Sequence, residues 1–120
     1  MARIRSTIAI VLVSLAAAAP AADTESEFAK EMNSSMDRMM AAMQVRTTGD
    51  IDRNFAAVMI PHHQGAIDMA VAELRYGRNP QLKRIAQEII VDQQQEIAAM
   101  RIAVGDPPPP SAPAQTQVEQ

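Results

Sequence analysis

Cysteine is absent from this chain of 120 residues, and aromatic residues are nearly absent: there are two phenylalanines, one tyrosine and no tryptophan. Without cysteine the chain can form neither a disulfide framework nor a thiolate metal site. Its stability must come from helix packing, from association of subunits or from a bound metal. Any metal ligands must then be histidine, methionine, aspartate or glutamate.

Basic residues are also too few and too scattered to form a patch. The only lysines are Lys30 and Lys83, and the formal net charge is −3. Nucleic-acid binding needs a basic stripe that neutralises phosphates, and recognition of anionic lipid needs a basic cluster. We therefore expect neither nucleic acid nor a membrane surface as a partner.

The first 21 residues have the layout of a secretory signal peptide. Arg3 and Arg5 give a positive start, an apolar run follows at residues 8–15, and residues 19–21 offer a small-x-small cleavage triplet. The apolar run is short for a membrane span. We expect cleavage near Ala22 and export to the periplasm, with no membrane attachment afterwards. A retained N-terminal anchor is the alternative.

Three segments after the signal have the apolar period of amphipathic helices, and no strand pattern is present. The first is expected at about residues 24–46, with a capping box formed by Thr24 and Glu27 and with Gly49 as its stop. The third is expected to begin at Asn79-Pro80, an N-cap followed by proline, and to end before Gly105.

The second helix is expected at about residues 50–76, with Asp50 as its N-cap and Gly77 as its stop. Pro61 lies inside its periodic pattern. Proline cannot donate the helical hydrogen bond, so we expect either a kink or two short helices that meet near Ile60.

These elements predict an all-α fold, a small bundle of about three helices. The helical domain is expected to cover residues 22–104, after a signal peptide at 1–21. Residues 105–120 include four consecutive prolines and should form a disordered or extended tail that contributes nothing to the core. A bundle of this size buries little surface alone, so a homodimer is one expected way to bury more.

The richest chemistry lies at His62-His63, the only histidines, within a methionine-containing apolar stretch. Met59 lies one turn before both histidines, so an imidazole and a thioether can share one metal ion. At about 100° per residue, one face of this helix carries Phe55, Met59, His62, Ala66, Met69 and Glu73. Imidazole nitrogen and thioether sulfur form a soft donor set of the kind that selects Cu(I).

Methionine also recurs in the first helix at steps of three and four, at Met32, Met36, Met39, Met40 and Met43. If this helix packs on the second, its thioethers would face the histidine region, and Met100 could join from the third helix, close to Glu96. Methionine at this spacing is also a common core filler. A methionine-rich surface can instead bind a partner helix without metal, and that alternative stays open.

Motifs of common catalytic sites are missing. Adjacent histidines do not match the His-Glu-x-x-His pattern of zinc proteases, and neither histidine follows a glutamate by three residues as in di-iron bundles. There is no glycine-rich phosphate loop, and no nucleophile-elbow motif indicates a serine triad. We therefore expect a binding protein and not an enzyme.

The stretch at residues 55–70, with Met-Ile-Pro-His-His at 59–63, resembles the signature of CopM-type copper-binding proteins. These belong to a large bacterial family long labelled only as a domain of unknown function. The resemblance continues through residues 72–77, 87–90 and 94–100, and covers about 36–101. It implies a ferritin-like helical bundle in the periplasm that binds Cu(I), with Ag(I) as its mimic. The implied role is copper resistance, buffering or metallochaperoning, with a copper-accepting or copper-exporting protein as partner.

The same resemblance implies a ligand set. The motif gives Met59, His62, His63 and Met69, and the third-helix motif adds Met100. The first helix matches the family less specifically, and its further candidate ligands are Met36, Met39, Met40 and Met43.

Overall fold

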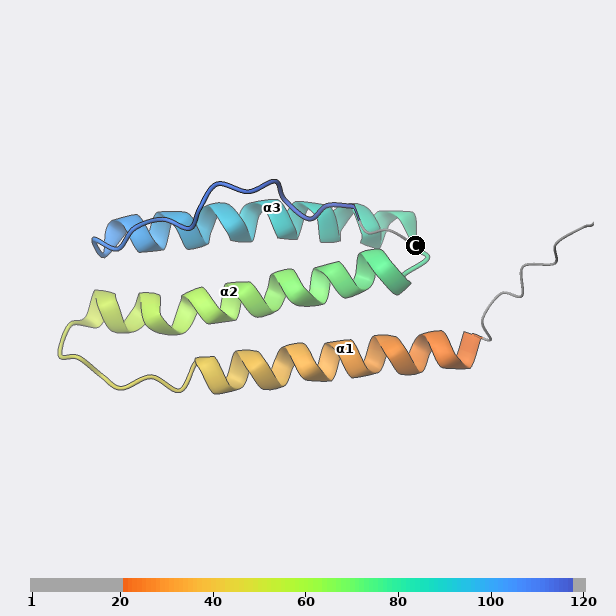
Figure 1. Ribbon diagram of the computed structural model, residues 1–120, viewed down its shortest axis with the longest axis horizontal. Coiled ribbons are helices and arrows are strands. Elements are labelled where there is room, and N and C mark those ends of the chain that lie inside the picture. Colours follow the sequence, from red (N-terminus) through yellow and green to blue (C-terminus); the bar gives the residue numbers. More distant parts are fainter. Residues whose placement is uncertain (1–20, 118–120) are drawn as a thin grey trace, which may run out of the picture.

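The computed structural model describes residues 21–117, which form three helices: α1 (Ala21–Ala42), α2 (Ile51–Tyr76) and α3 (Pro80–Ala103). This confirms the all-α prediction. α2 lies in the middle, with α1 along one side and α3 along the other (Figure 1). Within the described range α1 and α3 each pack on α2 but not on each other. The predicted signal peptide, apart from Ala21, lies outside these residues.

None of the helices between residues 21 and 117 is both long and apolar enough to cross a membrane.

The predicted caps of α2 and α3 are confirmed. Asp50 accepts a hydrogen bond from the backbone amide of Arg53 at 3.1 Å. Asn79 accepts one from the amide of Gln81 at 2.8 Å, and Pro80 is the first residue of α3. These side chains satisfy amides that a helix start leaves without partners.

α1 differs from its prediction at both ends. It is already helical at Ala21, so Thr24 lies inside the helix and the capping box predicted there is wrong. It ends at Ala42, earlier than the expected residue 46. The residues that follow include Val45, Thr47 and Thr48, whose β-branched side chains have low helix propensity.

The linker between α1 and α2 is fixed by α2. The amide and hydroxyl of Thr48 both donate to Oδ1 of Asn54, at 2.9 and 3.0 Å. Gly49 has a φ of 85°, the left-handed conformation that glycine adopts most easily. It lies just before the N-cap of α2 and not at the end of α1, so its predicted role as the stop of the first helix is wrong.

α2 continues through Pro61 without interruption. The alternative of two short helices is therefore wrong, while a bend of the axis at this point stays a prediction. Proline removes the hydrogen bond to the carbonyl of Ala57. Buried residues on both sides of it, Ala56 and Ile67, hold the two halves in one packed helix.

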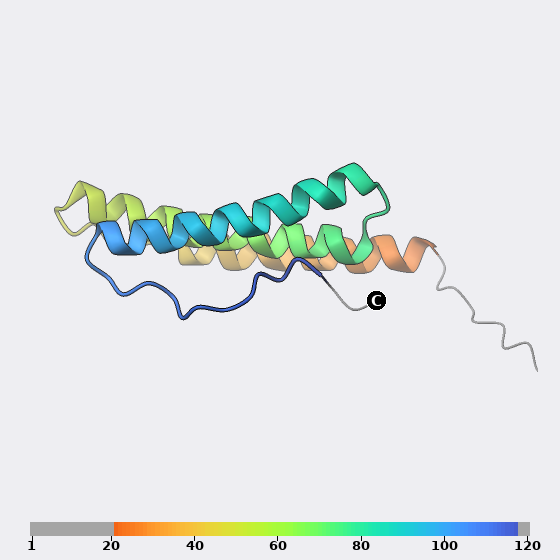
Figure 2. The ribbon, with the colours of Figure 1, turned by 90° about the horizontal axis from the view of Figure 1, so that it is seen from above.

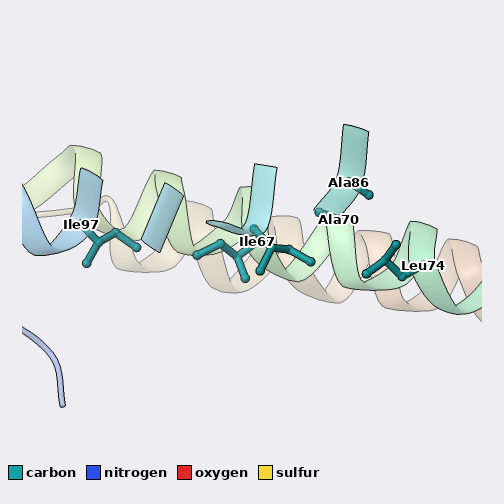
Figure 3. Packing of buried hydrophobic residues seen from close by; sticks show 6 residues of the cluster. Ile67, Ala70, Leu74, Ala86 and Ile97 are labelled. Carbon is teal, nitrogen blue, oxygen red and sulfur yellow. The ribbon is translucent and has the colours of Figure 1, made fainter. Parts of the chain in front are cut away.

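The hydrophobic core lies between α2 and α3. It contains Ile67, Ala70 and Leu74 from α2 and Ala86, Ile90 and Ile97 from α3 (Figure 3). Ile90 is fully buried. Since burial of one large aliphatic side chain stabilises by about 1.5–3 kcal/mol, the isoleucines and the leucine contribute most of the apolar stabilisation of this pair.

α1 is held on α2 by close packing of small residues. Ser35 is buried on α1, and Ala72 is fully buried on α2. Met39 lies directly against Gly65, where an added Cβ would come within 2.6 Å of the methionine sulfur. The close approach therefore depends on glycine at this position.

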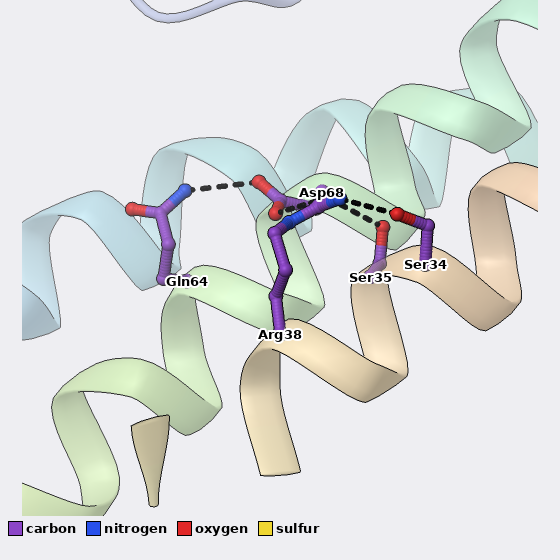
Figure 4. A network of polar contacts seen from close by, with 5 residues as sticks. All are labelled: Ser34, Ser35, Arg38, Gln64 and Asp68. Atoms are coloured by element: carbon purple, nitrogen blue, oxygen red, sulfur yellow. Dashed lines mark hydrogen bonds and ion pairs between the residues drawn. The ribbon is translucent and has the colours of Figure 1, made fainter. Parts of the chain in front are cut away.

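Polar side chains reinforce the same pair of helices (Figure 4). Arg38 of α1 donates to Asp68 of α2 at 3.1 Å, and also to the hydroxyls of Ser34 and Ser35 at 2.6 and 3.2 Å. Gln64 donates to the same aspartate at 3.0 Å. Arg38 is largely exposed, so this network fixes the position of α1 more than it adds stability.

A second polar cluster lies nearer the start of α1. The carboxylate of Glu31 accepts a hydrogen bond from the Tyr76 hydroxyl at 2.9 Å and another from Arg75. The hydrogen bond to Glu31 raises the pKa of Tyr76, because the neutral phenol is the donor. The same carboxylate raises the pKa of the Arg75 guanidinium.

The C-terminal tail, residues 106–117, runs back along α3 (Figure 1) on one side of the helical layer (Figure 2). Ala114 packs against the core cluster, and the side-chain amide of Gln87 donates to the carbonyl of Thr116 at 3.1 Å. The prediction that the tail contributes nothing to the core is therefore wrong for Ala114. Consecutive prolines keep the chain extended, and small side chains can then lie against α3.

Candidate metal centre

His63 points from the middle of α2 onto α3. Its side chain is only 10% exposed, with Nδ1 2.8 Å from the carbonyl oxygen of Met59 and Nε2 2.5 Å from Oε2 of Glu96. The carbonyl can only accept, so Nδ1 carries a hydrogen and donates to it. Nε2 and the Glu96 carboxyl share the second hydrogen bond, which ties the ring to α3.

The carbonyl that holds the ring belongs to Met59, one turn before His63. Pro61 leaves the carbonyl of Ala57 without its helical donor, so the carbonyl that holds His63 is not the one freed by proline. With Nδ1 fixed, Nε2 is the nitrogen that can reach a metal. Imidazoles that bind metals are commonly oriented in this way.

Met59 and Met100 lie at the level of this histidine. α2 and α3 are antiparallel, and His63 faces Glu96. The residue one turn before His63 is therefore opposite the residue one turn after Glu96. These two residues are Met59 and Met100; both are half-buried, and Met100 packs against the core cluster. We call this place, defined by Met59, His63, Glu96 and Met100, the α2–α3 seam.

His62 points away from the seam. It is exposed, and its ring centroid lies 5.9 Å from that of His63. Gln64 lies beside Pro109 of the tail. Since His62 is about 160° from Gln64 around the helix, it faces the opposite side of the layer. We call this side, which carries Phe55, His62 and Met69, the open face.

Met69 lies on the open face two turns after His62, in a groove of about 310 Å³ between α2 and α3. The groove also contains Ala66 and Ile89. The structure thus divides the four motif residues: Met59 and His63 lie at the level of Met100 along the seam, whereas His62 and Met69 lie on the open face.

The candidate methionines of α1 are separated from the seam by α2 itself, because α1 and α3 lie on opposite sides of it. Met39 packs against Gly65. Met36 and Met40 are about half exposed, at 47% and 55%, and Met43 is half-buried. None of the contacts described for α1 brings these residues to His63.

Sequence reasoning placed Glu96 near Met100 but missed it as the partner of His63. An assumed antiparallel pairing of the second and third helices could have identified Glu96, because it brings the end of the third helix back to the level of His63. Between residues 21 and 117, no group of three or more His, Cys, Asp or Glu side chains gathers to hold a metal ion. Methionine sulfur, the further donor type at the seam, is not among those side chains.

Comparison with known proteins places the chain in a family. The family model described as a domain of unknown function, DUF305, matches residues 11–104. The uncharacterized protein L153 of Acanthamoeba polyphaga mimivirus is 39% identical over 57 residues, which cover 47% of this chain but only 38% of the viral protein. No solved structure matches. Because the family model covers most of its length, the chain belongs to the DUF305 family.

Proposed function

We propose that the protein binds Cu(I), with Ag(I) as a chemical mimic, and that it buffers copper or passes it to another protein. The supporting observation is the environment of His63. A carbonyl holds its Nδ1 while Nε2 faces α3, at the level where Met59 and Met100 lie opposite each other. One imidazole and two thioethers form a soft donor set, which favours Cu(I) over harder divalent ions.

Glu96 occupies the position in front of Nε2, and its side chain is 60% exposed. A carboxylate is a hard donor and a poor ligand for Cu(I). Cu(I) at Nε2 would replace the hydrogen bond to Glu96; the proton shared by the two groups would be released to solvent, and the carboxylate would turn outward. We therefore propose Met59, His63 and Met100 as ligands, and Glu96 as the residue that orients the ring in the absence of metal.

His62 fits a role in transfer of the ion. It is exposed, and its ring lies next to that of His63. An ion that enters or leaves the seam from the open face would meet this imidazole first. We propose that His62 relays copper between the seam and the partner, which suits buffering or delivery and requires no catalytic step.

Export is part of the same proposal and rests on residues 1–21, with their basic start and apolar run. Thioethers need no deprotonation before they bind a metal and form no disulfides, so they serve as ligands in an oxidising compartment. Mass spectrometry of protein from the periplasm should find an N-terminus near Ala22. Full-length protein confined to the membrane fraction would favour the retained anchor.

Titration with Cu(I) against a competing chelator tests the proposal. His63→Gln should lower Cu(I) affinity by at least about tenfold, a free-energy change of about 1.4 kcal/mol, because it removes the only nitrogen donor at the seam. His62→Gln, its matched control, should change the rate of copper transfer to the chelator more than the affinity. Equal affinity of the parent and His63→Gln would refute the proposed site.

The second candidate function is binding of a partner protein without metal. It is supported by apolar side chains exposed on the open face, among them Phe55 and Ile85. The two candidates differ in the copper titration. An interaction module would bind Cu(I) no more tightly than a variant that lacks both histidines and Met59.

A further inference from the structure

Large apolar side chains gather on the open face. Phe55 of α2 and Leu82 and Ile85 of α3 are about half exposed. Leu82 and Ile85 border the groove that contains Met69. Phe55 lies near one end of the α2–α3 pair and Leu82 and Ile85 lie near the other, so apolar side chains are exposed along both helices on this face.

α1 extends this exposed apolar surface. Ser35, Arg38 and Ala42 lie toward the tail side, beside Pro109. Met36 and Met40 lie about 100° or more around the helix from Ser35, away from Arg38 and therefore on the open face. Both are about half exposed. The open face therefore spans all three helices.

The two sides of the layer differ in what covers them. The tail side carries charged and polar contacts, such as Arg38 with Asp68, and the chain's own tail lies over it. The open face carries methionine, isoleucine, leucine and phenylalanine around His62, with Glu73 as the one charged side chain that lines its groove. A mainly apolar centre is typical of a protein–protein interface.

The open face also has hollows and projections. The groove beside Met69 has a volume of about 310 Å³, and it includes three alanines, Ala66, Ala70 and Ala86, whose small side chains keep it hollow. Phe55 and Met36 project from the same face. In a two-fold interface the projection of one copy meets the hollow of the other, and the reverse contact follows from symmetry.

We propose that a second copy of this chain binds the open face and forms a two-fold symmetric homodimer. The exposed halves of the five side chains Met36, Met40, Phe55, Leu82 and Ile85 amount to an area on the order of 500 Å². The half-buried Met69 and Ile89 and the exposed ring of His62 extend this area toward the ~800 Å² per partner of a standard stable interface. In this dimer His62 of both copies lies within one interface, so the copper relay proposed for His62 operates in the dissociated chain.

Sedimentation of the metal-free protein tests this proposal independently of copper binding. The parent should sediment as a dimer at micromolar concentration. Ile85→Glu should weaken dimerisation by at least about 100-fold, because a charge would be buried in the interface. Ile102→Glu is the matched control: it makes the same substitution in α3 at an exposed isoleucine off the open face, and it should stay dimeric.

Met36→Glu places a charge on the same face from α1 and should also weaken dimerisation. If circular dichroism shows that Ile85→Glu has lost its helices, sedimentation of Met36→Glu tests the interface in its place. A monomeric parent would overturn the proposal and favour a different protein as the occupant of this face. A dimer that persists in both Ile85→Glu and Met36→Glu would also overturn it. Loss of Cu(I) binding with an intact dimer would refute only the copper proposal.

Discussion

His63 and Glu96 connect α2 to α3 through a hydrogen bond of 2.5 Å between Nε2 and Oε2. This contact defines the register of the two helices at their middle. Because Met59 and Met100 are each one turn from this pair, the same register places two thioethers opposite each other. The packing of the fold and the proposed copper site therefore depend on one relationship.

The tail should contribute modestly to stability. Truncation after Gly105 removes the contact of Ala114 with the core and the hydrogen bond that Gln87 donates to the carbonyl of Thr116. We expect a loss of about 1 kcal/mol, which lowers the Tm by ~4–8 °C in a domain of this size. Ala114→Glu should reproduce most of this loss in thermal unfolding, whereas Ala112→Glu, at an exposed position, should not. Equal Tm values for all variants would show that the tail does not pack in solution.

Gly65 should be intolerant of a larger side chain. Alanine improves helix propensity by about 1 kcal/mol, but its Cβ would lie 2.6 Å from the sulfur and 2.9 Å from the Cβ of Met39. Because the second of these atoms is tied to the backbone, α1 would have to move away from α2. We expect Gly65→Ala to destabilise by roughly 1–2 kcal/mol in chemical denaturation, since overpacking costs ~1–3 kcal/mol.

A double-mutant cycle supplies the control for this prediction. In a Met39→Ala background the same glycine substitution should cost less but should still destabilise, because the contacts with Sδ and Cγ are removed while the Cβ contact at 2.9 Å remains. Additive effects of the two substitutions would contradict the contact.

Tyr76 should ionise at higher pH than an ordinary tyrosine, because its hydroxyl donates to Glu31 and this raises its pKa. A pKa raised in the folded state contributes stability that is complete below the unfolded value of about 10 and is lost as pH rises through the folded value. The chain has no other tyrosine and no tryptophan, so ultraviolet absorbance reports this group alone.

Glu31→Ala should move the absorbance titration of Tyr76 to lower pH, toward the ordinary value. Glu27→Ala is the matched control on the same helix, because Glu27 pairs with Lys30. If the two variants titrate alike, the hydrogen bond to Glu31 does not set the pKa of Tyr76.

The sequence predicted features that depend on local chemistry. Asp50 and Asn79 were identified as caps because a short polar side chain before an apolar period satisfies free amides. The end of α1 was missed, because the periodic methionines continue to Met43 while the helix ends at Ala42. The spacing of apolar residues indicates which side of a helix is buried, but it does not define the residue at which the helix ends.

The candidate site was predictable only in part. The spacing of Met59 and His63 follows from one helix and could be read from the sequence. The pairing of His63 with Glu96 depends on how α2 and α3 align, and the separation of α1 from the seam depends on which side of α2 it occupies. Both are properties of tertiary packing, so the sequence pattern grouped the methionines of all three helices into one cluster.

X-ray absorption of the Cu(I)-loaded protein tests the central claim most directly, because it distinguishes sulfur from nitrogen donors. The parent should show sulfur scattering from Met59 and Met100 together with nitrogen from His63. The double variant Met59→Leu/Met100→Leu should lose the sulfur signal and bind Cu(I) more weakly. It should keep its helical circular dichroism, since each volume-conserving replacement costs less than about 1.5 kcal/mol. Met40→Leu, at an exposed position on α1, should match the parent. Unchanged sulfur scattering and affinity in the double variant would contradict the account.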